Sequence, residues 1–308
     1  SLAWGSFPCQ DLSLAGDMRG MDGGTRSSLY YEWLRVIREM EPHRRPPVLC
    51  VENVVGFLVA GRGKPFAAAY RALKDLGYAA GALVIDAVHF VPQSRPRAFL
   101  VAAAQDIPLH GLTLQSPDPA YHTKAVLTAC AAAADNAWIW WRLPPPPRLK
   151  QTLAGVCEFD APFDPPEKTA YLLSLLSPVN RAKLDEALKS GQTLVGAGYR
   201  RVRPDEHGVK RQRLEIRFDG LAGCLRTPNG GSSRQIAILV KDGRVHTRLL
   251  TVRETARLMG VRDSFKIPGT YNDGYRAMGD AVAVPVTAWI AKHLLKPLAQ
   301  RAAHAARP

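Results

Sequence analysis

The feature that most constrains the fold is an alternation of apolar segments and amphipathic helices between residues 1 and 105. The pattern predicts two helices, at about 27–40 and 65–76, strands at 48–51 and 98–103, and a strand or strand pair at 78–90. Strands that alternate with helices of this length are typical of α/β units built on a largely parallel sheet. In the first helix, Leu29, Trp33 and Ile37 share one face, and this spacing predicts that they pack in the core.

Reactive or anion-binding side chains stand next to three of these apolar segments. Cys9, in F-P-C-Q, follows an apolar segment at the start of the chain. Glu52 follows the strand at 48–51, and Arg95 and Arg97 precede the strand at 98–103. Ligand and catalytic groups of open α/β sheets collect at strand ends, so the pattern favours a functional site. Each residue also has an ordinary structural interpretation: a buried thiol for Cys9, a capping or salt-bridged carboxylate for Glu52, and a surface strand end for the two arginines.

The composition changes after Gln105, and residues 106–247 show no clean βαβ repeat. This stretch contains an Ala-rich helix at about 124–134, helical patterning at 168–189 and a strongly basic section from 200 to 234. The formal net charge of the chain is +14, which favours a polyanionic partner: nucleic acid first, an anionic membrane surface second. In the Gly-rich loop 225–235, Arg226, Thr227 and Arg234 are expected to contact base edges and phosphates of DNA, although a basic run is often only a solvated face.

The five cysteines form no C-x-x-C pair, which argues against a disulfide framework and against a zinc or other metal site. No apolar run approaches the ~20 residues of a membrane-spanning helix, and no signal peptide opens the chain. The expected location is the cytoplasm, in association with the nucleoid.

After residue 247 the helical signals return. Thr251 and Glu254 have the spacing of a capping box, which predicts a helix that Gly260 ends. Residues 274–285 are interpreted as a Gly-flanked turn that leads into a helix ending at Leu295. The expected organisation is a catalytic α/β domain at 1–105, a target-recognition domain at 106–247, and a segment at 248–308 that returns to the catalytic domain.

Five motifs, in this order, resemble those of the DNA (cytosine-5) methyltransferases. They are F-P-C-Q at 7–10, V-E-N-V at 51–54, Q-S-R-P-R at 93–97, L-T-V-R-E-T-A-R-L-M-G at 250–260 and G-D-A-V at 279–282. The resemblance covers nearly the whole chain, with a long variable region between the third and fourth motifs. It implies a Rossmann-like S-adenosylmethionine-dependent methyltransferase sheet of the α/β class, with a smaller inserted target-recognition domain.

The resemblance also implies roles for individual residues. Cys9 is the expected nucleophile, Glu52 the acid partner of the base, and Arg95 and Arg97 the contacts to the flipped nucleotide. The residues expected beside S-adenosylmethionine are Pro8, Leu29, Asp280, Ala281 and Val282. Gln10 and Ser13, together with the loop 16–25, are expected to fill the gap that the flipped base leaves in double-stranded DNA.

The chemistry of cytosine requires such groups independently. C5 is a poor nucleophile until a thiolate adds to C6, so an activated cysteine is needed. The addition pushes electrons toward N3, where a protonated or proton-sharing carboxyl stabilises the adduct. Arginine forks can fix O2 and the phosphates through paired hydrogen bonds.

Three departures from the family pattern stand out. The strand, Gly-rich turn and acidic strand ends that hold most of the cofactor in the family do not precede Ser1, and the tail does not restore them, which excludes a circular permutation. Either the sequence is truncated or a second chain supplies this half. Asp280 replaces the usual Asn; it can accept from the cofactor's ammonium group but repels its carboxylate. Cys224-Leu225 replaces the usual Thr-Leu pair of the recognition domain.

The leading hypothesis is a DNA (cytosine-5) methyltransferase of a bacterial or phage restriction-modification type. The alternative from a different class is a DNA-binding protein without activity, as a remnant or as one subunit of a split enzyme. A tRNA cytosine-5 methyltransferase is a third possibility, against which the long basic recognition region argues.

Overall fold

The computed structural model describes residues 1–7, 28–205, 207–227 and 234–305. The chain divides into two compact units. Unit 1 comprises residues 1–86, 96–146 and 288–308, and unit 2 comprises 87–95 and 147–287. These units do not have the expected domain boundaries, because residues 106–146 lie in unit 1 and residues 248–287 lie in unit 2. The function assigned to each stretch stays a prediction.

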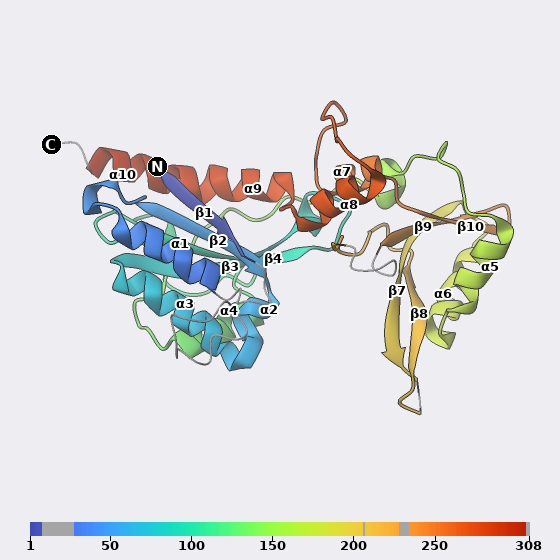
Figure 1. Ribbon diagram of the computed structural model, residues 1–308, viewed down its shortest axis with the longest axis horizontal. Helices are drawn as coiled ribbons and strands as arrows, with labels where there is room; N and C mark the ends of the chain where they lie inside the picture. The colour runs from blue at the N-terminus through green and yellow to red at the C-terminus, as the bar shows by residue number, and fades with distance from the viewer. Residues whose placement is uncertain (8–27, 206, 228–233, 306–308) are drawn as a thin grey trace. The chain divides into compact units, whose positions relative to one another are not determined.

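Unit 1 is built on a four-stranded sheet in the order β1-β2-β4-β3 (Figure 1). The strands are β1 (Leu2–Ser6), β2 (Val48–Val54), β3 (Tyr78–Asp86) and β4 (Pro96–Ala104). β1 and β2 are parallel, but β4 runs antiparallel to both of its neighbours. The expectation of a largely parallel sheet is therefore wrong here. A parallel connection needs a crossover of about a dozen residues or more, and the segment 87–95 between β3 and β4 is too short to provide one.

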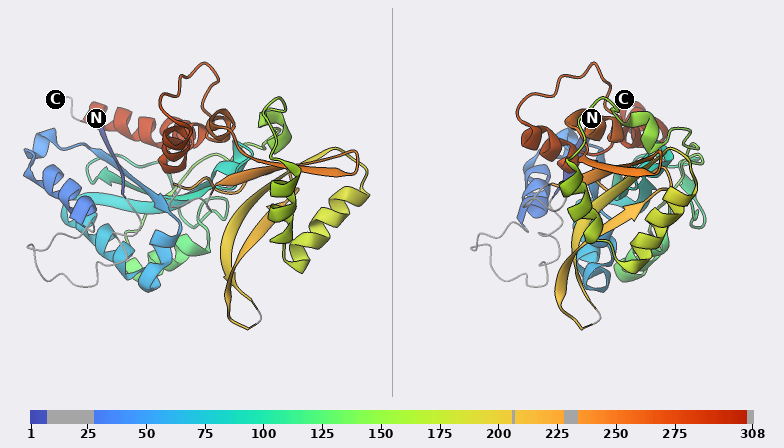
Figure 2. Two further views of the ribbon diagram at one scale, coloured as in Figure 1. Left: turned by 45° about the vertical axis from the view of Figure 1, so that its right-hand side comes forward. Right: turned by 90° about the vertical axis from the view of Figure 1, so that its right-hand side faces the viewer.

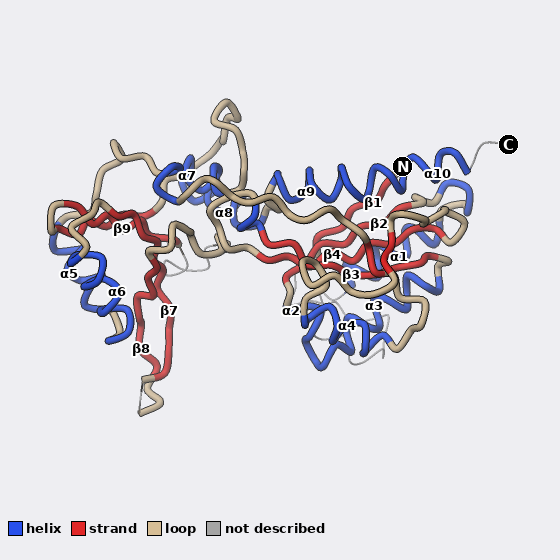
Figure 3. The backbone as a smooth tube through the Cα atoms, turned by 180° about the vertical axis from the view of Figure 1, so that it is seen from behind, coloured by secondary structure: helices blue, strands red, loops and turns tan. Residues whose placement is uncertain are grey.

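Helices cover both faces of this sheet (Figures 1 and 3). The predicted helices at 27–40, 65–76 and 124–134 are confirmed as α1 (Ser28–Glu39), α3 (Lys64–Asp75) and α4 (Lys124–Ala133). These three lie on one side of the sheet with the short α2 (Gly56–Val59). The π-helical turn Ala291–Leu295 and α10 (Lys296–Ala305), which continue α9 (Val284–Ile290), lie on the other side. Unit 1 is thus an α/β sandwich of three layers.

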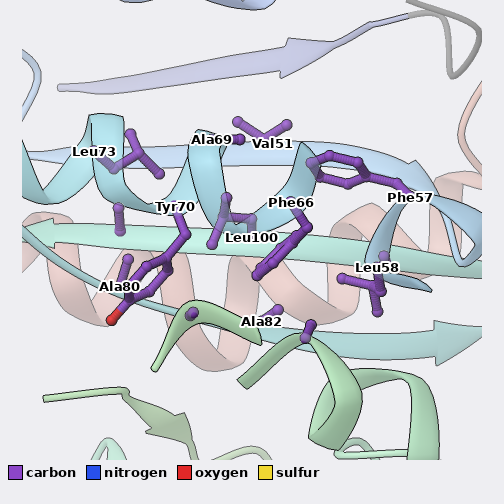
Figure 4. Close-up of a cluster of buried hydrophobic side chains, with 14 of the residues drawn as sticks. Val51, Phe57, Leu58, Phe66, Ala69, Tyr70, Leu73, Ala80, Ala82 and Leu100 are labelled. Carbon is purple, nitrogen blue, oxygen red and sulfur yellow. The ribbon is translucent and has the colours of Figure 1, made fainter. Parts of the chain in front are cut away.

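The core of unit 1 lies between the sheet and α1, α3 and α4. In Figure 4, Phe66 and Tyr70 of α3 lie on either side of Leu100 of the sheet, and Tyr70 extends toward Ala80. From α1, the fully buried side chains are Tyr30, Leu34 and Ile37.

The expected core position of Leu29 is wrong, because 47% of this residue is exposed. Helix α1 is turned by about one residue relative to the predicted face, since Tyr30 rather than Leu29 begins the buried i, i+4, i+7 series. The Tyr30 hydroxyl fixes this rotation by donating a hydrogen bond of 2.7 Å to the Ala69 carbonyl of α3.

The segment 106–146 is hydrogen-bonded directly to the sheet of unit 1. It contains the short strands β5 (Thr113–Leu114) and β6 (Trp140–Trp141). The buried Trp141 indole Nε1 donates to the carbonyls of Gly81, at 3.0 Å, and Val101, at 3.2 Å. A Cβ atom on Gly81 would lie 1.8 Å from the Ile139 carbonyl oxygen, so only glycine allows this close approach. These contacts explain why the segment belongs to unit 1.

Unit 2 is built on an antiparallel sheet in the order β10-β9-β7-β8 (Figure 2). Its strands are β7 (Leu194–Pro204), β8 (Lys210–Arg217), β9 (Gln235–Lys241) and β10 (Arg244–Leu249). One face packs on α5 (Pro166–Ser174) and α6 (Pro178–Lys189), which contribute Leu172 and Leu184 to the core, and Leu176 from the segment between them joins it. The sequence interpretation missed this sheet, although the alternation of Leu214 and Ile216 with polar neighbours is a strand signal.

The end of unit 2 is helical. The capping box of Thr251 and Glu254 is confirmed at the start of α7 (Val252–Leu258), and Gly260 has the positive φ of +73° expected of a helix terminator. The expected turn over 274–285 is wrong in its first half, where α8 (Tyr271–Asp280) forms instead. A second capping box, Thr270 with Asp273, starts this helix. Gly274 lies within it because a Cβ there would meet the Val252 side chain at 2.5 Å.

Four short 3₁₀ turns complete the described elements, at Pro42–Arg44, Ala60–Gly63, Ala87–His89 and Leu153–Val156. Among the described residues, no helix combines the length and apolarity needed to cross a membrane. The same residues contain no cluster of three or more His, Cys, Asp or Glu side chains arranged to hold a metal ion.

Candidate functional site

Glu52 and Arg97 form an ion pair on one face of the sheet of unit 1, with 3.1 Å between Glu52 Oε1 and Arg97 Nε. Glu52 of β2 lies opposite Phe99 of β4, and Arg97 precedes Phe99 by two residues, so both charged side chains emerge on the same face. The side chains are only 10% and 13% exposed. Glu52 is therefore a salt-bridged carboxylate, which is one of the two structural interpretations given above for this residue. Arg97 is not an exposed strand end.

The end of β1 is fixed beside Glu52. Parallel pairing sets Ser6 next to Glu52, and the Asn53 amide Nδ2 donates a hydrogen bond of 2.9 Å to the Phe7 carbonyl. The V-E-N-V motif thus supplies both the carboxylate and the group that holds the main chain at Phe7. Pro8, Cys9, Gln10 and Ser13, and the loop 16–25, lie outside the described residues.

Leu29, expected beside the cofactor, lies in the first turn of α1. Its exposed side chain is available for contact with an apolar group, which core packing would have prevented.

Arg95 lies in unit 2 and is 2% exposed. Its Nη1 donates to the Leu225 carbonyl at 2.7 Å, and its Nη2 donates to the carbonyls of Gly279 and Ala281 at 2.8 and 2.6 Å. The guanidinium thus holds two main-chain segments, 224–225 and 279–281. The interpretation of Arg95 as a surface strand end is wrong, and sequence reasoning missed these carbonyl contacts.

Gln93, from the same Q-S-R-P-R motif, connects further segments. The residue is fully buried; its Nε2 donates to the Leu258 carbonyl at 2.7 Å, and its Oε1 accepts from the Leu225 amide at 2.9 Å. Sequence reasoning did not select Gln93. The available signal was its place at the start of the Q-S-R-P-R motif, which also holds Arg95 and Arg97.

The G-D-A-V segment and the start of the Gly-rich loop lie together. A Cβ on Gly279 would meet main-chain atoms of Arg226 and Thr227 at 2.7 and 2.8 Å, so this approach requires glycine. The Thr227 hydroxyl donates to the Asp280 carboxylate. The structure therefore brings Asp280 and Ala281, expected at the cofactor, next to Arg226 and Thr227, expected at DNA. Val282 follows them and is half-buried.

Arg234, near the other end of the Gly-rich loop, lies against α8. Its Nη2 donates to the Asn272 side-chain oxygen at 2.5 Å, and its guanidinium carbon lies 5.7 Å from the centre of the Tyr271 ring. Burial raises the pKa of Tyr271 to about 12, although the Arg234 charge acts in the opposite direction. Arg226, by contrast, is exposed.

We expect Arg95→Met to lower the free energy of unfolding of unit 2 by about 3 kcal/mol, because three buried carbonyls lose their charged donor while the volume is kept. Urea unfolding followed by far-UV circular dichroism measures the change. Arg276→Met is the matched control. Arg276 is exposed on α8, the helix whose Gly279 carbonyl accepts from Arg95, and its replacement should leave the urea midpoint of unfolding unchanged. Equal midpoints for the Arg95 and Arg276 variants would show that the carbonyl contacts do not stabilise the unit.

Solved structures of similar fold are methyltransferases. The Dnmt2 methyltransferase of S. pombe superposes with a TM-score of 0.52 at 17% identity, over 96% of this chain and 78% of that one. The Entamoeba histolytica methyltransferase EhMeth gives 0.53 at 16% identity, over 96% and 77%. At this level of identity the likeness shows the fold, which confirms the predicted α/β methyltransferase architecture.

Sequence relatives cover nearly the whole chain. The Type II methyltransferase M.MspI of Moraxella sp. is 27% identical over 289 residues, which are 94% of this chain and 54% of the relative. The DNA-cytosine methyltransferase of Escherichia coli K12 is 29% identical over 324 residues, 96% of this chain and 60% of the relative. The chain thus spans between half and two thirds of these relatives' length. A family model described as C-5 cytosine-specific DNA methylase matches residues 2–296, so the chain belongs to this family.

Proposed function

We propose that this chain carries the cytosine-binding and DNA-reading parts of a DNA (cytosine-5) methyltransferase. The observation that supports this most directly is the Glu52–Arg97 pair beside the end of β1, whose last residue, Ser6, precedes Cys9 by three positions. The family model matches the chain from 2 to 296. The substrate is double-stranded DNA and the methyl donor is S-adenosylmethionine. The relatives include Type II methyltransferases, which supports a modification enzyme.

The proposed reaction begins with Cys9. Its thiolate forms a bond to C6 of a cytosine that has left the duplex, and the displaced electrons reach C5 and N3. C5 then forms a bond to the methyl group as the methyl–sulfur bond of the sulfonium donor breaks and a neutral thioether leaves. Transfer of the C5 proton to a base breaks the bond between the Cys9 sulfur and C6, which releases the thiolate and restores the ring. Because Cys9 follows Phe7 by two residues, the covalent chain keeps their Cα atoms within about 7.6 Å of each other. The Asn53–Phe7 hydrogen bond therefore anchors the segment that carries the nucleophile.

Glu52 is proposed to share a proton with N3 of the flipped base while Cys9 adds to C6. Arg97 holds this carboxylate at 3.1 Å, so a rotated Glu52 side chain would lose a charge-assisted contact. We assign the contact to O2 of the base to the Arg97 guanidinium. Arg95 acts through the main chain at 225 and 279–281, as a positioning residue.

The described residues fit part of the cofactor. S-adenosylmethionine supplies the methyl group when bound. Asp280 has an exposed carboxylate with acceptor positions beyond the one that Thr227 uses, which suits an ammonium group. Leu29 offers an exposed apolar surface. Pro8, Ala281 and Val282 complete the proposed set. Since the relatives are longer, we propose that the remaining cofactor contacts come from polypeptide outside this sequence, in the same chain or in a second one.

We propose that Arg226, Thr227 and Arg234 read the recognition sequence, and that Gln10 and Ser13 occupy the space left by the flipped base. Arg226→Ala should weaken binding to the recognised sequence by about 1–3 kcal/mol and leave binding to a random duplex unchanged, because a base contact is specific. Fluorescence anisotropy with the two duplexes measures both affinities. An equal loss of affinity for both duplexes would show that Arg226 contacts phosphates and not bases.

A methyl-acceptor assay tests the proposed function. The chain is incubated with labelled S-adenosylmethionine and either duplex DNA or tRNA, and the product is digested to identify 5-methylcytosine. Transfer to DNA supports the proposal, and transfer to tRNA alone overturns it. DNA binding without transfer, converted to transfer by a second polypeptide, would identify a split enzyme.

A further inference from the structure

One face of the β7–β8 hairpin is an arginine face. Partner residues of antiparallel strands share a face, so the pairs Arg201 with Arg213 and Arg203 with Arg211 emerge on one side of the hairpin. Arg217 is separated from Arg211 and Arg213 by an even number of residues along β8, so it lies on the same face, opposite Ala197. Five arginines thus share one face of a two-stranded ribbon, with Tyr199 opposite Glu215 between them.

The outer half of this ribbon extends beyond the rest of the sheet. β7 pairs with β9 only from Leu194 to Tyr199, whereas its pairing with β8 continues to Pro204 (Figure 2). The opposite face carries Leu214 and Ile216, which pack against α5 and α6 in the core of unit 2. In its outer half the arginine face is exposed to solvent, since the side chains of Arg203 and Arg211 are 49% and 61% exposed.

Acidic neighbours orient these arginines. Glu215 accepts from Arg203 Nε at 2.8 Å and from the Tyr199 hydroxyl at 2.6 Å, and it lies 3.7 Å from Arg201. Asp205 holds Arg211 at 2.6 Å. Burial alone would raise the pKa of Glu215, but the bonds from Tyr199 and Arg203 and the charges of Arg203 and Arg201 lower it overall. The carboxylate is thus ionised at neutral pH and aligns the guanidinium groups before any partner arrives.

We propose that this arginine face binds the phosphate backbone of duplex DNA, a contact that rests on the proposed function. Two N–H groups of a guanidinium can donate in parallel to two oxygens of one phosphate. A two-stranded ribbon also fits the ~12 Å wide major groove, whose edges are lined by phosphates. Phosphate contacts position a protein without reading sequence. The ribbon therefore supplies affinity, while the loop with Arg226 supplies specificity.

The test compares two triple variants of the whole chain that lose the same charge. Arg201, Arg203 and Arg213 are changed to alanine on the arginine face. Arg181, Lys183 and Lys189, exposed on α6 across the same sheet, are changed to alanine as the control. A third variant replaces the three ribbon arginines with lysine. Circular dichroism checks folding. DNA affinity is measured from 50 to 200 mM salt, roughly the range over which proteins that contact phosphates lose affinity steeply.

Three lost phosphate contacts should reduce the slope of log K against log salt by about 2.7, equally for recognised and random duplexes. The control should change the slope much less, and the lysine variant should retain most of it. The proposal is overturned by equal slopes for the ribbon and control variants, by a loss confined to the recognised duplex, or by a lysine variant as weak as the alanine one. Absence of methyl transfer to DNA even with the cofactor-binding part supplied, with this slope difference intact, would contradict the proposed function and leave the ribbon assignment standing.

Discussion

Replacing Cys9 with serine is expected to lower methyl transfer by about 10⁴-fold or more, because serine has no accessible anion to add to C6. Binding of duplex DNA should change less than about twofold, since the contacts proposed for affinity lie in unit 2 and in the loops. Initial rates with labelled S-adenosylmethionine and anisotropy titrations measure the two quantities separately.

Cys130→Ser is the matched control for this prediction. Burial, and secondarily the charge of Asp135, raises the pKa of the Cys130 thiol, so it is protonated and unreactive at neutral pH. Full activity is expected from this variant. Retained activity of Cys9→Ser, or an equal loss in both variants, would exclude Cys9 as the nucleophile.

Glu52→Gln is expected to lower turnover by about 10²–10⁴-fold, the range for loss of a general acid. Glutamine has the same shape but cannot give a proton to N3, so the KM for DNA should change much less than kcat. Steady-state kinetics on a duplex that contains the recognised sequence measures this split.

Because Glu52 also pairs with Arg97, a loss of stability must be separated from a loss of chemistry. Thermal unfolding of the variant shows whether unit 1 is intact, and Glu41→Gln, at an exposed position of the same unit, should leave both kinetics and unfolding unchanged. A fall in kcat no larger than that of the Glu41 variant would contradict the assigned role.

Several features were predictable because their signals are local. The capping box of Thr251 and Glu254 and the helix α3 depend on residues within a few positions of each other. The apolar run at 48–51 also located β2, but the strand continues to Val54, so Glu52 lies within it and not after it as expected.

Other features depend on partners that are distant in the sequence. Arg95 binds carbonyls 130, 184 and 186 residues away, and no local pattern specifies them. The assignment of residues 106–146 to unit 1 depends on Trp141 reaching the carbonyls of Gly81 and Val101. The antiparallel direction of β4 follows from the length of one connection, which the motif order does not reveal.

The arginine face lies between these cases. The sequence showed a basic section, but only the register of β7 and β8 assigns Arg201, Arg203, Arg211 and Arg213 to one face and Arg200 to the other. A shift of one residue in this register would distribute the charges differently, so composition alone could not predict the surface.

The central claim is tested most directly by trapping on a duplex that carries 5-fluorocytosine at candidate sites, with S-adenosylmethionine present. Fluorine cannot leave C5 as a proton does, so the thiolate stays bonded to C6. We predict a covalent protein–DNA adduct that survives denaturation and that Cys9→Ser removes. Salt-sensitive DNA binding without any adduct, for the chain alone and with the cofactor-binding part supplied, would contradict the account.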